Sequence, residues 1–439
     1  AKDYGEDYLH THSKIIENHL QHVVYAINQP AAARGYQSVF WNISLYDEPY
    51  FSSMFGDFVF PDMSHPNWNR LFKLQHFFLK WFNAERLKAI LTFPVVTAAM
   101  LTAGGKPVDS SFADMCAEEL SEGNSFFVYQ SESADSLASC CRLRNEISDH
   151  TFSYSLGAGG VATGSINVIT LNMNRLVQKQ YNLAEEVQKI QKYQVAFRKL
   201  IEDYKNGGLL PVYDAGFISL DKQFLTIGIN GMVEAAEYLG ISPNNNAQYK
   251  DFVRHQLKII YEENRKARSI YGYMFNTEFV PAENLGVKNA QWDQKDGLFS
   301  PRDCYNSYFY AVEDEQINVL DKIILHGKEI IQYLDGGSAL HLNLEETPNK
   351  EGFLKLLNAT ALAGCNYFCF NIRITICNKC NHIDKRTLFE CPSCHSEDVD
   401  HATRVIGYLK RVSCFSAARQ KEHRLRHYHL SRKKEEVLS

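Results

Sequence analysis

Residues 377–409 read CNKCNHIDKRTLFECPSCHSEDVDHATRVIGYL, and this stretch decides how the rest of the chain is interpreted. It contains two C-x-x-C pairs with ten residues between them. The four sulfurs belong to Cys377, Cys380, Cys391 and Cys394. Thiolates bind Zn²⁺ in a tetrahedron, and each tight C-x-x-C turn can supply two ligands. The stretch therefore predicts one tightly bound zinc ion, followed closely by a segment that contains Gly407.

Two disulfides or four buried thiols are the alternatives to zinc. Paired C-x-x-C turns in a chain with an odd total of 11 cysteines favour metal binding in a reducing cytoplasm. His382 and His395 flank the pairs and could replace a cysteine ligand. Four thiolates already close a structural site, however, so this zinc is expected to hold structure and to do no chemistry.

The composition is that of an ordinary globular protein, with 439 residues, 45% hydrophobic and 22% charged. A net charge of −5 argues against a general nucleic-acid-binding surface. The longest apolar run, residues 89–104, is too short to cross a membrane and contains Pro94. The chain begins at Ala1 without a Met, so it is expected to be part of something longer.

Strand-like and helix-like segments alternate along the chain. Strands are expected at residues 38–44, 89–100, 338–344 and 367–372, and helices at 176–204 and 247–269. This alternation predicts an α/β fold built from parallel β/α units, with an active site at the carboxyl ends of the strands. We expect one large barrel-like domain, residues 1–372, and a small zinc-binding C-terminal region, residues 373–439.

Two other segments have simpler interpretations. Residues 156–165 are rich in glycine but lack the G-K-[ST] ending of a phosphate-binding loop, which favours a flexible loop. The tail from residue 419 to residue 434 is basic and predicts a helix exposed to solvent.

Several short motifs follow one another in a telling order. They are CCRLR, TGSINVITLN, IGINGMVEA, VPAENLG, DGGSALHLNL, NYFCFNIRITICNKC, CPSC and RVIGYL. In this order they resemble the anaerobic, class III ribonucleoside-triphosphate reductases, from about residue 28 to the C-terminus. That family implies a glycyl radical enzyme on a ten-stranded α/β barrel, with a finger loop inside it. The family's N-terminal ATP-binding region and the first part of the barrel are not recognisable here.

The resemblance assigns the two radical positions. Gly407 would store the radical, and Cys141, directly before Arg142, would become the thiyl radical, with its neighbour Cys140 as the weaker choice. An alpha-carbon radical is stabilised by the flanking amides, and only glycine lacks a side chain that would twist it. The thiyl can remove hydrogen from C3′ of the ribose, so that the 2′-hydroxyl leaves as water. The barrel would exclude oxygen and bulk water.

Two segments are candidates for binding the ribonucleoside triphosphate. Residues 280–285 suggest a strand, a turn and a helix start, with Pro281, Ala282 and Glu283 at the start. Free amides there could hold the triphosphate, and a helix cap without a ligand is the alternative. Gly164 and Ser165 are expected to precede a strand near the ribose.

The resemblance also implies partners. These are a radical-SAM activating enzyme, nucleotide effectors, a second copy of the chain in a homodimer, and a reductant. Ser165 stands near a position where the formate-using branch has Asn, so a redoxin dithiol rivals formate. The second cysteine that this route needs could be Cys304, Cys365 or Cys369, or could lie outside the chain.

A zinc-ribbon protein that binds nucleic acid or a protein partner is the alternative function. It would need a basic face near the cysteines. Lys379, Lys385 and Arg386 supply positive charge, but the surrounding acidic residues cancel it. Neither nucleic acid nor a membrane is expected as a partner of the reductase.

Overall fold

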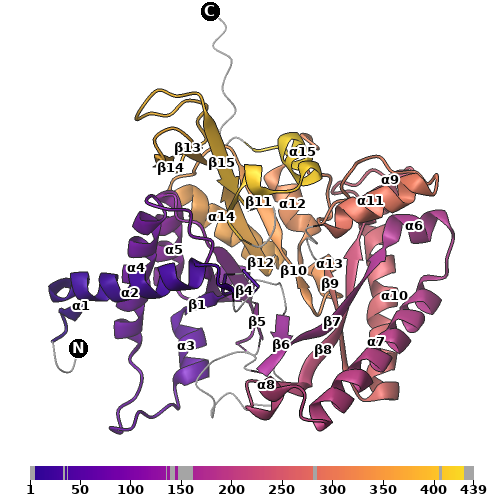
Figure 1. Ribbon diagram of the computed structural model, residues 1–439, viewed down its shortest axis with the longest axis horizontal. Helices are drawn as coiled ribbons and strands as arrows, with labels where there is room; N and C mark the ends of the chain where they lie inside the picture. Colours follow the sequence, from indigo (N-terminus) through magenta and orange to yellow (C-terminus); the bar gives the residue numbers. More distant parts are fainter. Residues whose placement is uncertain are drawn as a thin grey trace, which may run out of the picture.

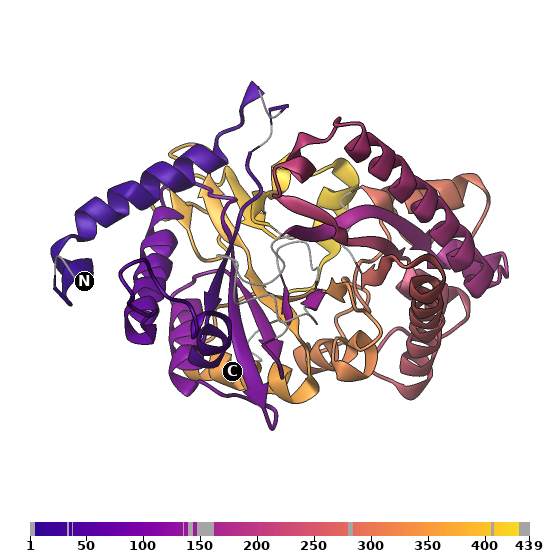
Figure 2. The same cartoon turned by 90° about the horizontal axis from the view of Figure 1, so that it is seen from below.

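The computed structural model describes most of the chain in eight stretches. These are residues 5–32, 35–36, 38–134, 136–138, 144–146, 162–279, 284–404 and 408–429. Within them, two large sheets lie between two groups of helices, and a smaller sheet lies at one end (Figure 1). Seen from below, the two groups of helices again lie on the outside of the sheets (Figure 2).

The first large sheet has the strand order β1-β2-β4-β12-β11, with β3 added to β2. Its strands are β1 (Asn42–Tyr46), β2 (Val95–Ala103), β3 (Lys106–Pro107), β4 (Phe127–Ser131), β11 (Leu340–Leu344) and β12 (Tyr367–Ile372). β1, β2 and β4 run parallel, and β11 runs parallel to β12. β12 pairs antiparallel with β4, so the expectation of purely parallel units is wrong at the centre of this sheet.

The second large sheet has the order β10-β9-β8-β7, and all of its pairs are parallel. Its strands are β7 (Ala162–Asn172), β8 (Ile218–Asn230), β9 (Met274–Phe279) and β10 (Gly337–Ser338). Only Ala339 separates β10 from β11, so one extended segment passes directly from the second sheet into the first. The sheets are thereby adjacent. The expected closed barrel of ten strands does not appear in the pairing of the described residues.

Helices cover the outer faces of both sheets. Those around the first sheet are α1 (Tyr8–Thr11), α2 (Ser13–Asn28), α3 (Glu48–Phe55), α4 (Trp68–Glu85), α5 (Ser110–Ser121), α12 (Val319–Leu325) and α14 (Lys350–Ala363). Those around the second are α6 (Met173–Gln178), α7 (Leu183–Asn206), α8 (Pro211–Asp214), α9 (Met232–Tyr238), α10 (Ala247–Tyr271), α11 (Leu285–Lys295) and α13 (Lys328–Ile331). Within the described stretches, no helix has both the length and the apolar character needed to cross a bilayer.

The third sheet has the order β14-β13-β15-β16 and is followed by a short helical end. Its elements are β13 (Ile374–Cys377), β14 (Ile383–Asp384), β15 (Val399–Thr403), β16 (Lys410–Arg411), the 3-10 turn η3 (Val412–Cys414) and α15 (Ala417–Leu425). A further hairpin pairs β5 (Ser136–Ala138) with β6 (Arg144–Glu146).

Side-chain alternation gives each large sheet two different faces. In the first sheet, Val96 and Val128 pack with Phe82 and Phe112 of the covering helices. The neighbouring residues along each strand point to the opposite face of the sheet. There Phe127 belongs to a separate cluster. That cluster includes Val95, Ala99, Tyr129, Tyr367 and Cys369. The face turned away from the helices is therefore rich in tyrosine and carries a cysteine.

The long helices begin where asparagine or aspartate caps the first turn. Asn182 accepts backbone N–H donors at the start of α7, and Asn246 does so at the start of α10. The sequence predicts one helix over residues 176–204, but Gln180 has a φ of +52° and ends α6 before α7 begins. The helix expected at 247–269 is confirmed as α10, which ends at Gly272 with a φ of +70°.

The expected solvent-exposed helix in the basic tail is wrong. α15 is short, and Arg419, Glu422 and His423 on it are buried. Glu422 accepts hydrogen bonds from Arg419 at 2.6 Å and from the buried Arg426 at 2.8 Å. Burial opposes the charge, but Arg426 and Arg419 lower the pKa of Glu422 to about 2. The basic composition of the tail does not predict this triad of Arg419, Glu422 and Arg426, which packs the tail onto the larger part of the molecule.

Candidate active site

Four cysteine sulfurs converge at one end of the third sheet. The sulfurs of Cys377, Cys380, Cys391 and Cys394 all lie within 4.8 Å of one another. Two of the separations, Cys377 to Cys394 and Cys380 to Cys391, are 3.6 Å. Zinc–sulfur bonds of about 2.3 Å in a tetrahedron place the sulfurs about 3.8 Å apart. The four cysteines thus fit a zinc ion.

The local backbone explains why these sulfurs converge. Asn381 and His395 follow the two pairs and have φ values of +61° and +56°, which close the turns. The N–H of Cys380 donates to the sulfur of Cys377 at 3.4 Å, which helps to lower the pKa of Cys377 to about 7. The exposed His395 pairs with Glu390 at 2.8 Å, so it is engaged away from the sulfurs.

The third sheet connects the cysteine cluster to the segment around Gly407. β15 pairs with Cys377 at Val399 and with β16 at Thr403. Residues 404–409 join β15 to β16. The cysteines and this connection therefore belong to one small sheet. Gly407 itself lies outside the described residues.

Arg404 fixes the first flank of that connection. Its side chain is 1% exposed, and it donates to Ser125 through both terminal nitrogens, with 3.0 Å from Nη2 to the Ser125 carbonyl oxygen. Its backbone N–H donates to Asn371 Oδ1 at 3.0 Å, and its carbonyl oxygen accepts from Asn371 Nδ2 at 2.8 Å. Arg404 is thus held where β4 begins and β12 ends.

Tyr408 and Leu409 fix the second flank. The Tyr408 ring lies 5.9 Å from the ring of Phe93 and 5.8 Å from that of Phe40, measured between centroids. The Leu409 carbonyl oxygen accepts from Thr92 Oγ1 at 3.2 Å. Both flanks of residues 405–407 are therefore anchored near the starts of β2 and β4.

The β5–β6 hairpin carries the predicted thiyl segment. Ala138 pairs with Arg144, so residues 139–143 connect the two strands. Those residues include Cys140 and Cys141, which lie outside the described residues. The hairpin follows the carboxyl end of β4, whereas Arg404 is held at the opposite end of the same strand. The two predicted radical segments are thus attached to opposite ends of β4.

A row of polar side chains crosses the second sheet on the face turned away from its helices. Ser165 Oγ lies 2.6 Å from Thr226 Oγ1, which donates to Asn276 Oδ1 at 2.6 Å. Asn276 is fully buried, and its Nδ2 has no hydrogen-bond partner among the described residues. Gly164 and Ser165 were expected to precede a strand, but both lie within β7, beside a break in its register with β8. The Asn276 amide is a candidate ligand group that sequence reasoning missed.

Helix α11 begins later than the sequence predicts. Its N-cap is Asn284 and its first residue is Leu285. Pro281, Ala282 and Glu283 lie outside the described residues. The propensities of VPAENL do not separate a helix that starts at Pro281 from one that starts four residues later.

Two buried polar residues fasten α11 to the ends of the parallel strands. Asn289 Nδ2 donates to Asn230 Oδ1, at the end of β8, at 2.9 Å. Asp293 is fully buried and accepts from Arg175 Nε at 2.7 Å and from Tyr305 OH at 2.8 Å. Asn172, the last residue of β7, and Asn174 of α6 also donate to it. The middle and the last turn of α11 are therefore fastened to the carboxyl edge of the second sheet.

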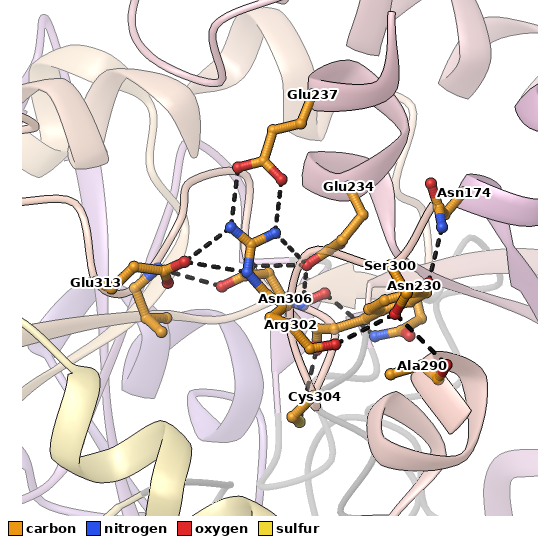
Figure 3. Close-up of polar contacts among 12 residues, drawn as sticks. Asn174, Asn230, Glu234, Glu237, Ala290, Ser300, Arg302, Cys304, Asn306 and Glu313 are labelled. Carbon is orange, nitrogen blue, oxygen red and sulfur yellow. Dashed lines mark hydrogen bonds and ion pairs between the residues drawn. The ribbon is translucent and has the colours of Figure 1, made fainter. Parts of the chain in front are cut away.

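Arg302 links the same edge to helix α9 (Figure 3). Its guanidinium pairs with Glu234 at 2.9 Å, with Glu237 at 2.8 Å and with Glu313 at 2.7 Å. The fully buried Glu234 also accepts from Asn306, whose carbonyl oxygen accepts from Asn230. Burial raises the pKa of Glu234, although Arg302 opposes this shift. This continuous network, unrecognised in the sequence, orders the loop that follows α11.

We predict that Asp293→Ala destabilises the protein far more than Asp296→Ala. Both carboxylates pair with Arg175, but Asp293 is fully buried and Asp296 is 42% exposed. Removing the buried partner should cost about 3–5 kcal/mol of unfolding free energy. Removing the exposed partner should cost less than about 1 kcal/mol. Urea unfolding of the zinc-loaded proteins measures both, and equal losses would contradict the anchoring role of Asp293.

The three cysteines considered for a dithiol reductant route lie in different environments. Cys365 belongs to the core that packs under the helices, and Cys304 lies beside α15. Cys369 lies on the inner face of β12, in the cluster that contains Tyr129 and Tyr367. Of the three, Cys369 is the one on the inner face of the sheet, in the same cluster as Phe127 and Tyr129 of β4.

Comparison with known proteins identifies the family. The family model described as "Anaerobic ribonucleoside-triphosphate reductase" matches residues 2–429 of this chain. The chain belongs to this family. An anaerobic ribonucleotide reductase structure matches the reductase with a TM-score of 0.83 and 30% identity, covering 95% of this chain and 68% of its own. No match is found among the curated proteins.

Further solved structures agree with this assignment. The anaerobic ribonucleotide reductase from Thermotoga maritima in complex with dATP and CTP has a TM-score of 0.81 and 30% identity. The match covers 95% of this chain and 70% of that one. A glycyl radical enzyme from Archaeoglobus fulgidus, 12% identical with a TM-score of 0.51, covers 84% and 56% and shares the fold. The reductase is therefore an oxidoreductase that reduces ribonucleoside triphosphates by glycyl radical chemistry, and the zinc-ribbon alternative is not supported.

Proposed function

We propose that Gly407 stores the radical and that Cys141 becomes the thiyl radical that reacts with the ribose. The observation that supports this most strongly is the anchoring of Arg404 and Tyr408 on both sides of residues 405–407. The same strand, β4, leads at its other end to the hairpin that contains Cys141. A five-residue strand spans about 17 Å, so two loops that extend inward from its ends could meet within that length.

The proposed reaction transfers hydrogen atoms in a closed cycle. The Gly407 alpha carbon takes hydrogen from Cys141, and the thiyl takes hydrogen from C3′ of the ribose. The 2′ carbon–oxygen bond then breaks and water leaves, while the reductant supplies two electrons and C2′ gains hydrogen. Cys141 then returns its hydrogen to C3′, which regenerates the thiyl radical. The thiyl takes hydrogen back from the Gly407 alpha carbon, which restores the stored radical. A scaffold that excludes bulk water protects these intermediates.

We propose that the two large sheets belong to the ten-stranded barrel of this family. Residues 1–372 would be the barrel domain, and residues 373–439 the zinc and radical region. The third sheet begins at Ile374, which supports that boundary. The tail nevertheless returns to the barrel domain, where His429 bridges to Leu344 of β11. The two regions are thus fastened together at both ends of the second one.

We propose that the substrate triphosphate binds at the start of α11. Backbone N–H groups at a helix N-terminus favour phosphate, and those of Ala282, Glu283 and the first residues of α11 would present them. Pro281 has no N–H and would shape the turn that leads into the site. The attachment of Asn289 and Asp293 supports such a site, because it fixes the position of α11 at the carboxyl edge of the sheet and so lowers the ordering that binding requires. The Thermotoga relative was solved in complex with dATP and CTP, which is consistent with nucleotide binding here.

The ribose and the reductant are proposed to meet near Gly164 and Ser165. The polar row of Ser165, Thr226 and Asn276 offers hydroxyl and amide groups on the inner face. Either formate, oxidised to carbon dioxide, or a redoxin dithiol would supply the two electrons. Cys369 is the described cysteine best placed to relay a dithiol reductant.

Several partners complete the proposal. A radical-SAM activating enzyme would generate the Gly407 radical, nucleotide effectors would control substrate choice, and two copies would form a homodimer. The cysteine content favours a reducing cytoplasm.

Zinc is proposed to hold the base of the radical segment. We predict that Cys391→Ser, which leaves three thiolates, lowers zinc content and slows formation of the Gly407 radical, because metal binding supplies local folding energy. Cys414→Ser is a matched control, since Cys414 is exposed and lies outside the cluster. Metal analysis and EPR spin counting measure the two effects. Full radical yield in zinc-depleted Cys391→Ser protein would contradict this role.

The activity is tested by anaerobic treatment of the full chain with a radical-SAM activating enzyme. Each of the four ribonucleoside triphosphates is then supplied with either formate or a reduced redoxin. We expect deoxynucleoside triphosphate only from activated protein and with only one of the two reductants. A stored radical that gives no product with either reductant would overturn the proposed reductant routes.

A further inference from the structure

A cleft opens between the end of α4, the loop after α5 and the third sheet. The cleft is partly open to solvent, and its space, open solvent included, amounts to about 540 Å³. Its walls include Arg86, Ser125, Phe370, Lys385 and Leu409. None of the residues that line it is an aspartate or glutamate. The cleft therefore has two cationic walls and no anionic one within the described part of the chain.

Arg86 is the principal cation. It is 7% exposed and donates from Nη1 to the Ser125 carbonyl oxygen at 2.6 Å. Its Nε is buried without a hydrogen-bond partner, and no carboxylate pairs with it among the described residues. Burial, and then the charge of Arg404, hold the pKa of Arg86 well below its usual value. A buried cation without a counterion is costly unless an anion accompanies it.

Lys385 supplies the second positive charge. It is half-buried, and its Nζ donates to the Glu122 carbonyl oxygen at 2.8 Å, at the C-terminal end of α5. The negative end of that helix offsets part of the cationic charge. The Nε of Arg86 still has no hydrogen-bond partner among the described residues. Arg404 donates to the same Ser125 carbonyl oxygen as Arg86, so two guanidinium groups converge there.

We infer that this cleft binds a small tetrahedral oxyanion of the phosphate class, held by Arg86 and Lys385. A guanidinium edge and a neighbouring ammonium offer the charge-assisted donors that phosphate oxygens accept. The apolar walls formed by Phe370 and Leu409 strengthen these contacts by lowering the local dielectric. The oxyanion could be inorganic phosphate or the phosphate end of a nucleotide.

The position of the cleft gives the bound anion a structural consequence. Leu409 is both a wall of the cleft and part of the connection that contains Gly407. Ser125 is contacted by Arg86 in the cleft and by Arg404 on the other flank of that connection. An anion that fixes Arg86 therefore stabilises both flanks of residues 405–407, whether or not Gly407 carries a radical.

The test measures binding of inorganic phosphate and, separately, of ATP at a second site besides the substrate site proposed at α11. Both are measured on the zinc-loaded full chain by calorimetry at constant ionic strength. Arg86→Gln and Lys385→Gln remove the two cations. Arg386→Gln is the matched control, because Arg386 is exposed, pairs with Asp384 and does not line the cleft. We expect each cleft variant to weaken binding at least about tenfold and the control to leave it unchanged.

Hydrogen exchange locates the effect. Saturating anion is expected to slow amide exchange in residues 399–411 of the parent protein but not of Lys385→Gln, a half-buried position whose replacement should not prevent folding. Loss of the second ATP site alone in the cleft variants would identify a nucleotide phosphate as the ligand, and loss of phosphate binding would identify the free ion. Absence of binding, or equal weakening by Arg386→Gln, would overturn the inference.

Discussion

Gly407→Ala is expected to give a protein that folds and binds zinc but stores no radical and makes no deoxynucleotide. A methyl group on the alpha carbon crowds the planar, amide-conjugated radical and twists it out of conjugation. Zinc should remain because all four sulfurs lie on β13 and the turns before β15. The loss of turnover should exceed about a thousandfold, the scale expected when an essential reacting group is removed.

The measurement is paired EPR spin counting and product assay on anaerobically activated protein. Gly207→Ala is a suitable control, because Gly207 ends α7 with a φ of −78° and an added Cβ would meet nothing closer than 3.4 Å. It should keep both radical and activity. Turnover above background in Gly407→Ala would refute the assignment of the stored radical.

Cys141→Ser is expected to abolish turnover while leaving the Gly407 radical able to form. Serine is close in size to cysteine, but its O–H bond is too strong to relay hydrogen. Neighbouring side chains on an extended tip point to opposite sides, so only one of Cys140 and Cys141 can face the ribose. Arg142 would help to order the tip through its planar donors. Cys140→Ser should therefore retain most of its activity.

The two serine variants distinguish between specific errors. An inactive Cys140→Ser protein beside an active Cys141→Ser protein would move the thiyl radical by one residue. Activity in both variants would show that neither Cys140 nor Cys141 forms a thiyl radical that turnover requires. EPR on each variant separates loss of the relay from loss of the stored radical.

The parts of the molecule that the sequence predicts well are those where local chemistry is sufficient. The geometry of the four cysteines follows from two C-x-x-C turns, and β12 and α10 follow from periodicity and caps. The family follows from the order of motifs, which the comparisons confirm. The roles of Cys141 and Gly407 stay predictions, because both lie outside the described residues.

The features that the sequence does not predict depend on contacts between distant segments. The antiparallel pairing of β12 with β4 joins residues more than two hundred positions apart. The burial of α15 depends on Glu422 meeting Arg419 and Arg426, which net charge alone cannot show. Asp293 and Arg302 are ordinary charged residues in sequence. Only folding brings their partners, such as Asn174 and Glu234, around them.

The most direct test of the central claim is EPR of the activated reductase prepared with glycine deuterated at its alpha carbon. A glycyl radical keeps one alpha hydrogen, whose coupling splits the signal into a doublet. We predict a doublet from ordinary protein, its collapse to a single line on deuteration, and no signal from Gly407→Ala. A signal that is unchanged by deuterated glycine, or that persists in Gly407→Ala, would contradict the claim that Gly407 stores the radical.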